Sequence, residues 1–194
     1  MRRALPLILF ITGCVTAKPK PREEILLPPS VFPKETTIRW FDIDGDTEAE
    51  ISAQLEAKGA EKQTAFTAWQ VTWNMPLQQG EEGCSLGPVT TDVRITMRLP
   101  RWKGPADPKD PLVQRWKKYL DGLKEHESGH RETGFSAATD IAELLPSLPP
   151  KPTCEEAETA ANAAAHEVLA KYRQRDEEYD AETKHGKTQG AVFP

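Results

Sequence analysis

The sequence predicts an α+β domain in which a small, mainly antiparallel sheet packs on two long helices. Three patterns carry this prediction: period-two alternation in two segments, a long amphipathic helical pattern, and an alanine-rich helical pattern near the end of the chain. They cover residues 64–75 and 89–99, residues 111–145, and residues 154–179. Alternation with one polar face indicates a sheet with one side exposed to water, which is usually antiparallel.

The strand and turn signals can be placed in chain order. Residues 36–43, rich in β-branched and aromatic side chains, form the first expected strand. Thr47 and Glu50 then fit a capping box, which predicts a short helix that stops at Gly59. The apolar faces of the two alternating segments are formed by Trp69, Val71, Trp73 and Met75, and by Val89, Val93, Ile95, Met97 and Leu99. These faces should meet the helices in the core.

Both long helices carry recognisable boundaries. Asp110 can cap the first, with Pro111 at its first position, and the prolines between residues 146 and 152 end it. Its apolar face is marked by Val113, Trp116, Leu120 and Leu123. The second should begin at Cys154 and run to about Tyr179, with a narrow apolar stripe. That stripe is formed by Ala157, Ala161, Ala164, Val168 and Tyr172.

The segment before residue 34 carries signals of bacterial export. Residues 1–13 combine a basic start with an apolar stretch that is too short to span a bilayer. The sequence Ile11-Thr12-Gly13-Cys14 resembles a lipoprotein box, which predicts cleavage before Cys14 and lipid on its thiol; an ordinary secretory signal is the alternative. Residues 14–33 contain five prolines and should form an extended tether. We therefore expect an exported protein anchored to a bacterial membrane, with Val15 after the lipidated residue favouring the outer membrane.

Residues 34–190 are expected to form one domain, because no internal repeat or second core is apparent. The formal net charge of −5 argues against nucleic acid as a partner. With Cys14 assigned to lipid, Cys84 and Cys154 remain. In an oxidising compartment two such cysteines most simply form a disulfide with each other. Zinc ligation is the alternative, but the CxxC spacing of structural zinc sites is missing.

The strongest chemical signal is His126-Glu127-Ser128-Gly129-His130, which matches HExxH. On a helix, His126 and His130 project from one face and can bind the same Zn²⁺. Glu127 lies at the edge of that face, where it could act as general base on a water activated by zinc. The helical spacing places this motif on the buried side of the first long helix. That placement favours a metal site over two solvated histidines.

Four features together resemble a known bacterial family. They are the HESGH motif after Trp116 and Tyr119, the strand end Leu99-Pro100-Arg101-Trp102, the cysteine pair, and the terminal pattern Tyr179-Asp180-x-x-Thr183-x-His185-Gly186. Over roughly residues 34–190 they resemble a domain family of unknown function that is described as predicted secreted zinc-dependent proteases. The resemblance implies a zincin-like site. Thr133 and Ser136 stand where metzincins have glycine and a third histidine, so the chain departs from that group.

A third zinc ligand is needed beside the two histidines. His185, in a turn with Gly186 and within the terminal pattern of the resembled family, is the preferred candidate. Asp180 and the glutamates of the last helix are the alternatives, and Asp180 could instead hold a ligating histidine in place. His166 lies in the middle of the alanine-rich helix and is expected to be a solvated or packed side chain. Tyr179 is a candidate oxyanion donor, with a capping or core role as its alternative.

The sequence thus predicts zinc-dependent hydrolysis of a peptide, protein or cell-wall amide at the cell envelope. An edge strand of the sheet could hold an extended peptide. The competing interpretation is a non-catalytic zinc-binding lipoprotein that acts as a structural or partner-binding module. Catalytic zinc sites keep one position open, whereas structural sites are closed by four protein ligands. The three persuasive ligands favour an open site.

Overall fold

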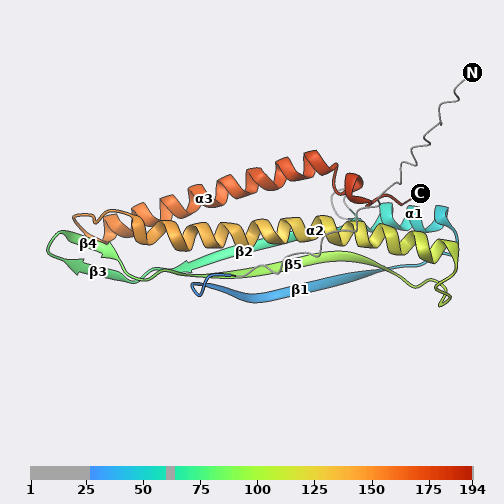
Figure 1. The fold of residues 1–194 in the computed structure, drawn as a ribbon, viewed down its shortest axis with the longest axis horizontal. Coiled ribbons are helices and arrows are strands. Elements are labelled where there is room, and N and C mark those ends of the chain that lie inside the picture. Colours follow the sequence, from blue (N-terminus) through green and yellow to red (C-terminus); the bar gives the residue numbers. More distant parts are fainter. Residues whose placement is uncertain (1–26, 60–63, 194) are drawn as a thin grey trace, which may run out of the picture.

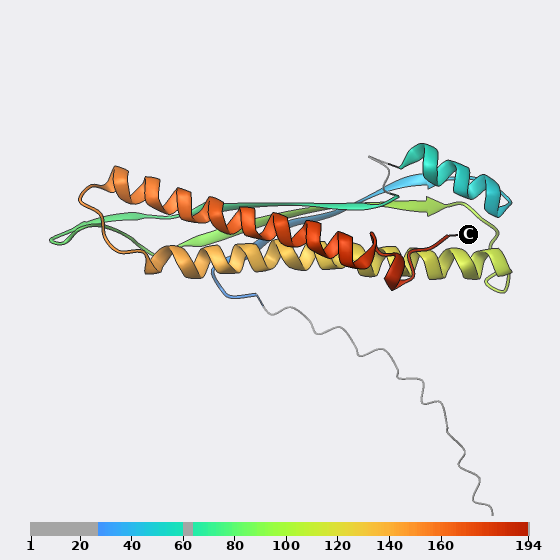
Figure 2. The same ribbon diagram turned by 90° about the horizontal axis from the view of Figure 1, so that it is seen from above.

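The computed structural model describes residues 27–59 and 64–193, and their arrangement confirms the expected α+β class. Figure 1 and Figure 2 show a long molecule with α1 at one end and the β3–β4 hairpin at the other. The expected signal segment, the lipidation site Cys14 and most of the expected tether lie outside the described residues. The elements are β1 (Val31–Ile43), α1 (Glu48–Lys58), β2 (Phe66–Asn74), β3 (Leu77–Gly80), β4 (Gly83–Leu86), β5 (Thr90–Trp102), α2 (Pro111–Leu144), η1 (Leu145–Ser147), α3 (Cys154–Thr183) and η2 (Lys187–Gln189).

The main sheet has the order β1-β5-β2, with β5 in the centre. β2 is antiparallel to β5, as the alternation predicts, but β1 is parallel to β5, so the sheet is mixed. Strand direction is not encoded in the pattern of a single strand, because alternation is the same in both directions. β1 also begins at Val31, so residues 31–33 of the expected tether belong to the sheet. The segment between β2 and β5 forms the β3–β4 hairpin, which the strand signals of the sequence did not include.

α2 covers one face of the sheet, and its boundaries follow the expected signals. The side chain of Asp110 accepts hydrogen bonds from the backbone N–H groups of Leu112 and Val113, with Pro111 at the first position. The apolar face of β5 is buried against this helix, with Val93 fully inaccessible to solvent. Gly134 lets the indole of Trp69 lie directly on the α2 backbone, because a β-carbon there would collide with it. The helix therefore lies close to the sheet along its length.

α3 returns along α2 in the opposite direction, on the side away from β1 (Figure 1). A disulfide joins Cys84 on β4 to Cys154, the first residue of α3, which confirms the expected pairing. The buried stripe of α3 differs slightly from the expected one: Ala165 and Leu169 are buried, whereas Ala164 and Val168 are only partly buried. Both stripes fit a helical period, and contact with the sheet selects between them.

The chain after α3 turns back onto the first half of α2. Phe193 contacts the rings of Trp116 and Tyr119, with centroid distances of 5.7 and 5.3 Å. These residues belong to a second core cluster, which α1 closes with Ile51 and Leu55. Within the described residues, no helix is long and apolar enough to cross a membrane. The tail and α1 thus bring two distant parts of the chain beside the first half of α2.

Candidate metal centre

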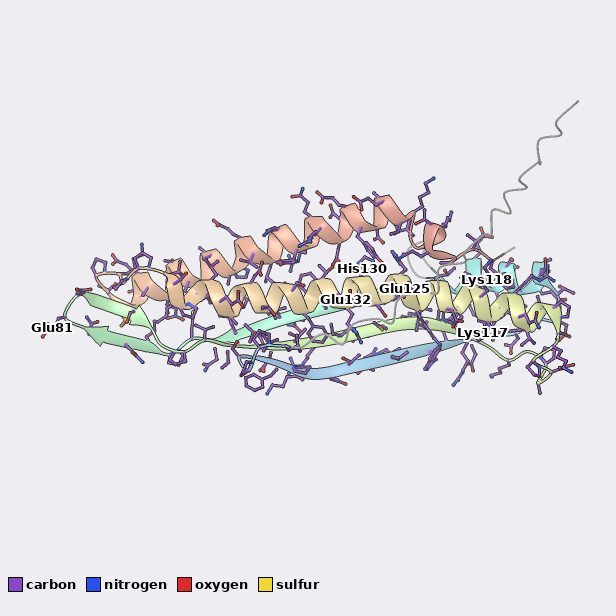
Figure 3. All side chains as sticks on the ribbon, in the orientation of Figure 1. Glu81, Lys117, Lys118, Glu125, His130 and Glu132 are labelled. Atoms are coloured by element: carbon purple, nitrogen blue, oxygen red, sulfur yellow. A yellow bond between two sulfur atoms is a disulfide. The ribbon has the colours of Figure 1, made fainter. Side chains whose placement is uncertain are left out.

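The HESGH motif lies in the middle of α2, at the level where α3 ends. His126 and His130 are one helical turn apart, and their rings meet edge to face with centroids 4.8 Å apart. Both are buried, with 4% and 7% of their surface exposed. Figure 3 shows His130 on the side of α2 that faces α3. The two imidazoles therefore lie between the helices, as the sequence predicts.

Asp180 on α3 completes a group of three side chains that could hold a metal ion. Its Oδ1 lies 3.0 Å from Nε2 of His126 and 3.1 Å from Nε2 of His130, and the two Nε2 atoms are 3.3 Å apart. Two nitrogens and one oxygen thus form a nearly equilateral triangle. Around a tetrahedral zinc ion with bonds of about 2.0–2.1 Å, neighbouring donor atoms are about 3.3 Å apart. The triangle therefore has the size that such an ion requires.

The structure places Asp180, the sequence alternative, in this group and leaves His185 outside it. α3 continues to Thr183, four residues beyond the expected end, so Asp180 is still helical and faces α2. Lys184 and His185 then adopt left-handed conformations with φ of 52° and 53°, which reverse the chain. The side chain of His185 is 59% exposed, and its Nδ1 lies 3.4 Å from Oδ1 of Asp180. His185 thus flanks the centre.

Each histidine of the group is held from behind through its other ring nitrogen. Nδ1 of His130 donates to Asp176, 2.9 Å away, and the second oxygen of Asp176 accepts a hydrogen bond from the indole of Trp69. Nδ1 of His126 lies 3.2 Å from the side-chain oxygen of Gln189. A proton on each Nδ1 leaves the Nε2 lone pair of a neutral ring directed into the triangle. Such supporting contacts orient metal-ligating histidines in proteins.

The electrostatics of the group favour a bound cation. Burial lowers the pKa of His126, and the neighbouring His130 lowers it further, so this imidazole is neutral. Burial also opposes protonation of His130, but the hydrogen bond to Asp176 and the charges of Asp176 and Asp180 outweigh burial and raise its pKa. Nε2 of His126, Nε2 of His130 and Oδ1 of Asp180 lie 3.0 to 3.3 Å from one another, so the group favours a positive charge among these atoms, either a proton on His130 or a metal ion.

Glu127 is the most buried carboxylate beside the group, with 2% of its surface exposed. Burial raises its pKa to about 7, although a hydrogen bond from Thr67 acts in the other direction. The hydroxyl of Thr67, on β2, lies 2.7 Å from Oε2 of Glu127 and 3.1 Å from the backbone carbonyl of the same residue. The sheet therefore fixes the carboxylate of Glu127 beside the candidate metal group. A pKa near neutrality suits a group that takes up and releases protons.

Tyr179 forms a wall of the centre. Its ring stacks on His126 with centroids 5.1 Å apart and planes only 8° from parallel. Its hydroxyl lies 3.3 Å from the backbone carbonyl of His126 and within hydrogen-bond reach of Gln189. Gly129 permits this contact, because a β-carbon there would collide with the tyrosine ring. The geometry matches the packing alternative for Tyr179 better than the oxyanion role, since the hydroxyl faces the helix backbone.

A cleft of about 730 Å³ opens beside the centre. His126 and Glu127 lie in its wall, together with residues from α1, from the entry to β2, from the first half of α2 and from the C-terminal tail. The lining residues are Ser52, Leu55, Glu56, Thr64, Ala65, Tyr119, Leu123, His126, Glu127, His185, Lys187, Ala191, Val192 and Phe193. A ligand in this cleft would therefore lie against both His126 of the candidate metal group and the buried carboxylate of Glu127.

Three residues of the centre were not anticipated from the sequence: Thr67, Asp176 and Gln189. Asp176 carried a usable signal, because it lies four residues before Asp180 and so shares its helix face. Thr67 carried none, since it acts on Glu127 across a sequence separation of 60 residues. Gln189 depends on the reversal of the chain after α3, which the sequence did not define.

The chain matches the model of a protein family over residues 38–186, which is most of its length. The family is described as bacterial protein of unknown function (DUF922), and the chain belongs to it. No curated protein and no solved structure matches the chain. Every residue of the triangle, and Glu127, lies inside the matched segment. Gln189 and the apolar tail lie just beyond it.

Proposed function

We propose that this protein is a zinc-dependent hydrolase of peptide or other amide bonds at the bacterial cell envelope. The observation that carries the proposal is a group of three converging donor atoms, one of them from His126, which lies with the buried carboxylate of Glu127 in the wall of one cleft. A solvated pair of histidines would need neither a third ligand nor supporting hydrogen bonds. The His-His-Asp donor set suits Zn²⁺, which takes imidazole nitrogens and carboxylate oxygens in tetrahedral sites.

The number of ligands favours a catalytic centre over a structural one. Among the described residues, His126, His130 and Asp180 are the side chains that converge on one point. Structural zinc sites are closed by four protein ligands, whereas catalytic sites keep a position for water or substrate. Three ligands beside an open cleft fit the second arrangement.

The residues around the centre can divide the chemistry of amide hydrolysis among them. Zinc, when bound, supplies a Lewis acid that polarises a carbonyl and lowers the pKa of water to about 7. Glu127 takes the proton from the attacking water at its carboxylate and passes it to the leaving nitrogen. Thr67 keeps that carboxylate in place, and Asp176 and Gln189 hold the two imidazoles. Excluding bulk water from Glu127 keeps its pKa close to neutrality.

A free strand edge supports a peptide as the substrate. Thr64 and Ala65, which lead into β2, line the cleft. In the described part of the chain, β5 is the only strand that pairs with β2. The other edge of β2 therefore offers backbone donors and acceptors to an extended chain. The export signals before residue 34 support a location at the envelope, with Cys14 as the lipid anchor.

Metal removal and restoration test this function. The mature protein, treated with a chelator, should lose hydrolysis of a broad peptide pool and regain it with one equivalent of zinc. Asp180→Ala protein treated in the same way should regain little activity, because the third ligand is missing. Equal hydrolysis with and without bound metal would contradict the proposal. Zinc binding without hydrolysis of any protein or cell-wall peptide would favour the non-catalytic zinc-binding module.

A further inference from the structure

The cleft beside the metal centre has an apolar compartment. Leu55, Tyr119, Leu123 and Ala191 form its inner surface, and each of them is less than 9% exposed. Val192, 60% exposed, lies at its rim with the partly buried Phe193. These residues come from α1, α2 and the C-terminal tail, so three elements converge on it. An apolar surface of this kind favours an apolar side chain, because burial of apolar surface is favourable by about 25 cal/mol per Å².

We infer that this compartment binds a bulky apolar side chain of the substrate next to the bond that is cleaved. The inference rests on the proposed function and names its substrate class: peptides with residues such as leucine or phenylalanine at that position. His126 and Glu127 share the cleft wall with the apolar residues, so a substrate bond held at the centre has its neighbouring side chain within the compartment. Charged lining residues, such as Glu56 and Lys187, leave the peptide backbone and its polar groups a hydrated path.

The same features disfavour cell-wall peptides. Their side chains are short or charged, and a charged group loses hydration when it packs against apolar residues such as Leu55 and Leu123. A methyl group would leave most of the compartment unfilled and gain little from burial. The structure therefore favours exported proteins or peptides over peptidoglycan as the substrate.

Binding of two hydroxamates tests the inference without relying on turnover. A hydroxamate group binds zinc, so acetyl-leucine hydroxamate and acetyl-glycine hydroxamate differ only in the side chain offered to the compartment. The zinc-loaded full-length protein should bind the leucine compound at least about tenfold more tightly, the lower end of what hydrophobic pockets achieve. Calorimetric titration measures both affinities. Equal affinities, or failure of both compounds to bind zinc-loaded protein, would overturn the inference.

A substitution at the rim tests whether the compartment causes the preference for the leucine hydroxamate. Val192→Asp places a charge at the compartment on an exposed side chain and should reduce the leucine preference about tenfold while zinc affinity is unchanged. Leu77→Asp, the matched control, places the same charge on an exposed leucine of the distant hairpin and should leave the preference intact. An undiminished preference in Val192→Asp overturns the inference.

The two proposals fail in different ways. A protein that binds zinc and prefers the leucine hydroxamate, but hydrolyses nothing, contradicts the hydrolase and leaves the compartment supported. One that hydrolyses peptides without a side-chain preference contradicts only the compartment. A protein that does not bind zinc contradicts both the hydrolase function and the substrate compartment.

Discussion

At the scale of single residues, two aspartates on one face of α3 divide the support of the centre. Asp180 places its Oδ1 within 3.1 Å of both Nε2 atoms, and Asp176, one turn earlier, accepts the Nδ1 proton of His130. The spacing of four residues makes both contacts possible from one straight helix. One carboxylate can therefore act as ligand while the other fixes a ligating ring.

Loss of Asp180, the proposed third ligand, should weaken zinc binding far more than loss of the nearby His185. Asp180→Ala removes a donor atom of the triangle and should weaken zinc binding more than about 100-fold, beyond the usual effect of a supporting residue. His185→Ala removes a side chain that lies outside the triangle and should stay close to wild type. Competition with a fluorescent zinc chelator measures both affinities. A large loss in His185→Ala with none in Asp180→Ala would reverse this assignment.

Asp176 should affect the metal through His130 without contacting it. Asp176→Asn keeps the shape of the side chain but weakens the acceptor for Nδ1 of His130, so zinc affinity should fall about 10- to 100-fold. The same residue accepts the indole proton of Trp69, and Trp69→Phe is therefore the control for that second contact. Unchanged affinity in Asp176→Asn, measured in the same chelator competition, would show that His130 needs no support.

Site residues that lie close together in the sequence could be recognised from the sequence alone. His126, Glu127 and His130 are separated by less than two turns of helix, so their common face follows from helical geometry alone. Asp180 required the end of α3 to be known, and the expected end at Tyr179 fell four residues early. With the helix cut there, His185 becomes the more plausible ligand. The choice between Asp180 and His185 as third ligand thus depends on whether α3 continues for one more helical turn.

At the scale of elements, α2 and α3 form a helical hairpin that is fastened at two places. The disulfide ties the beginning of α3 to β4, and the contacts of Asp176 and Asp180 with the two histidines join its end to the middle of α2. Between these points the α3 stripe is built largely from alanines, which bury little surface per residue. The position of α3 therefore depends on these two connections more than it would if its stripe carried larger apolar side chains.

Removal of the disulfide should lower stability without removing the metal site. Cys84 and Cys154 are separated by 70 residues, and closing such a loop is worth about 4 kcal/mol in the chain-entropy model. The Cys84→Ser, Cys154→Ser double variant should therefore unfold at lower urea concentration. Its zinc affinity should stay near wild type, because the centre lies at the opposite end of α3. Two reactive thiols in the native, unreduced protein would instead exclude the bridge.

Tyr119 makes the packing of α2 sensitive to alkaline pH. Burial raises its pKa from 10.0 to about 12, against the effect of its hydrogen bond to Thr64. The folded state therefore keeps a proton that the unfolded chain loses. Stability from this group is complete below pH 10.0 and is lost as the pH rises to about 12, by about 3 kcal/mol in total.

Tyr119→Phe should lack this dependence. At neutral pH the variant should be less stable by about 1 kcal/mol, since Thr64 loses its hydrogen-bond partner. The difference should reverse as the pH approaches 12, and urea unfolding across this range measures it. A constant difference at every pH would mean that the phenol ionises as readily in the folded protein as in the unfolded one.

The elements show which parts of the fold the sequence could define. Capping residues such as Thr47 and Asp110 set the starts of α1 and α2, because their hydrogen bonds are local. The parallel direction of β1 could not be obtained in this way, since its pairing with β5 joins residues far apart in the chain. The β3–β4 hairpin is local, but its strands have only four residues each and show no clear alternation. The contact of Thr67 with Glu127 likewise joins two residues that are 60 positions apart in the chain. Non-local contacts therefore account for most of what the sequence left open.

At the scale of the whole molecule, the long sheet and α2 carry the centre in their middle. The hairpin tip around Glu81 lies far from His130 (Figure 3). α1 and the C-terminal tail come from opposite ends of the chain and close the cleft on the other side of the centre. The matched family segment, residues 38–186, includes the His126, His130 and Asp180 group and most of the residues that line the cleft, and it stops before Ala191, Val192 and Phe193.

The most direct test of the central claim compares Glu127→Gln with wild type on one peptide pool. Both proteins should bind one zinc ion, because the amide replaces a carboxylate that is not part of the ligand triangle. Hydrolysis by the variant should fall about 10²- to 10⁴-fold, as expected for loss of a general base. Glu143→Gln, the same change at an exposed position of α2, should retain full activity. Hydrolysis by zinc-loaded Glu127→Gln at the wild-type rate would contradict the account.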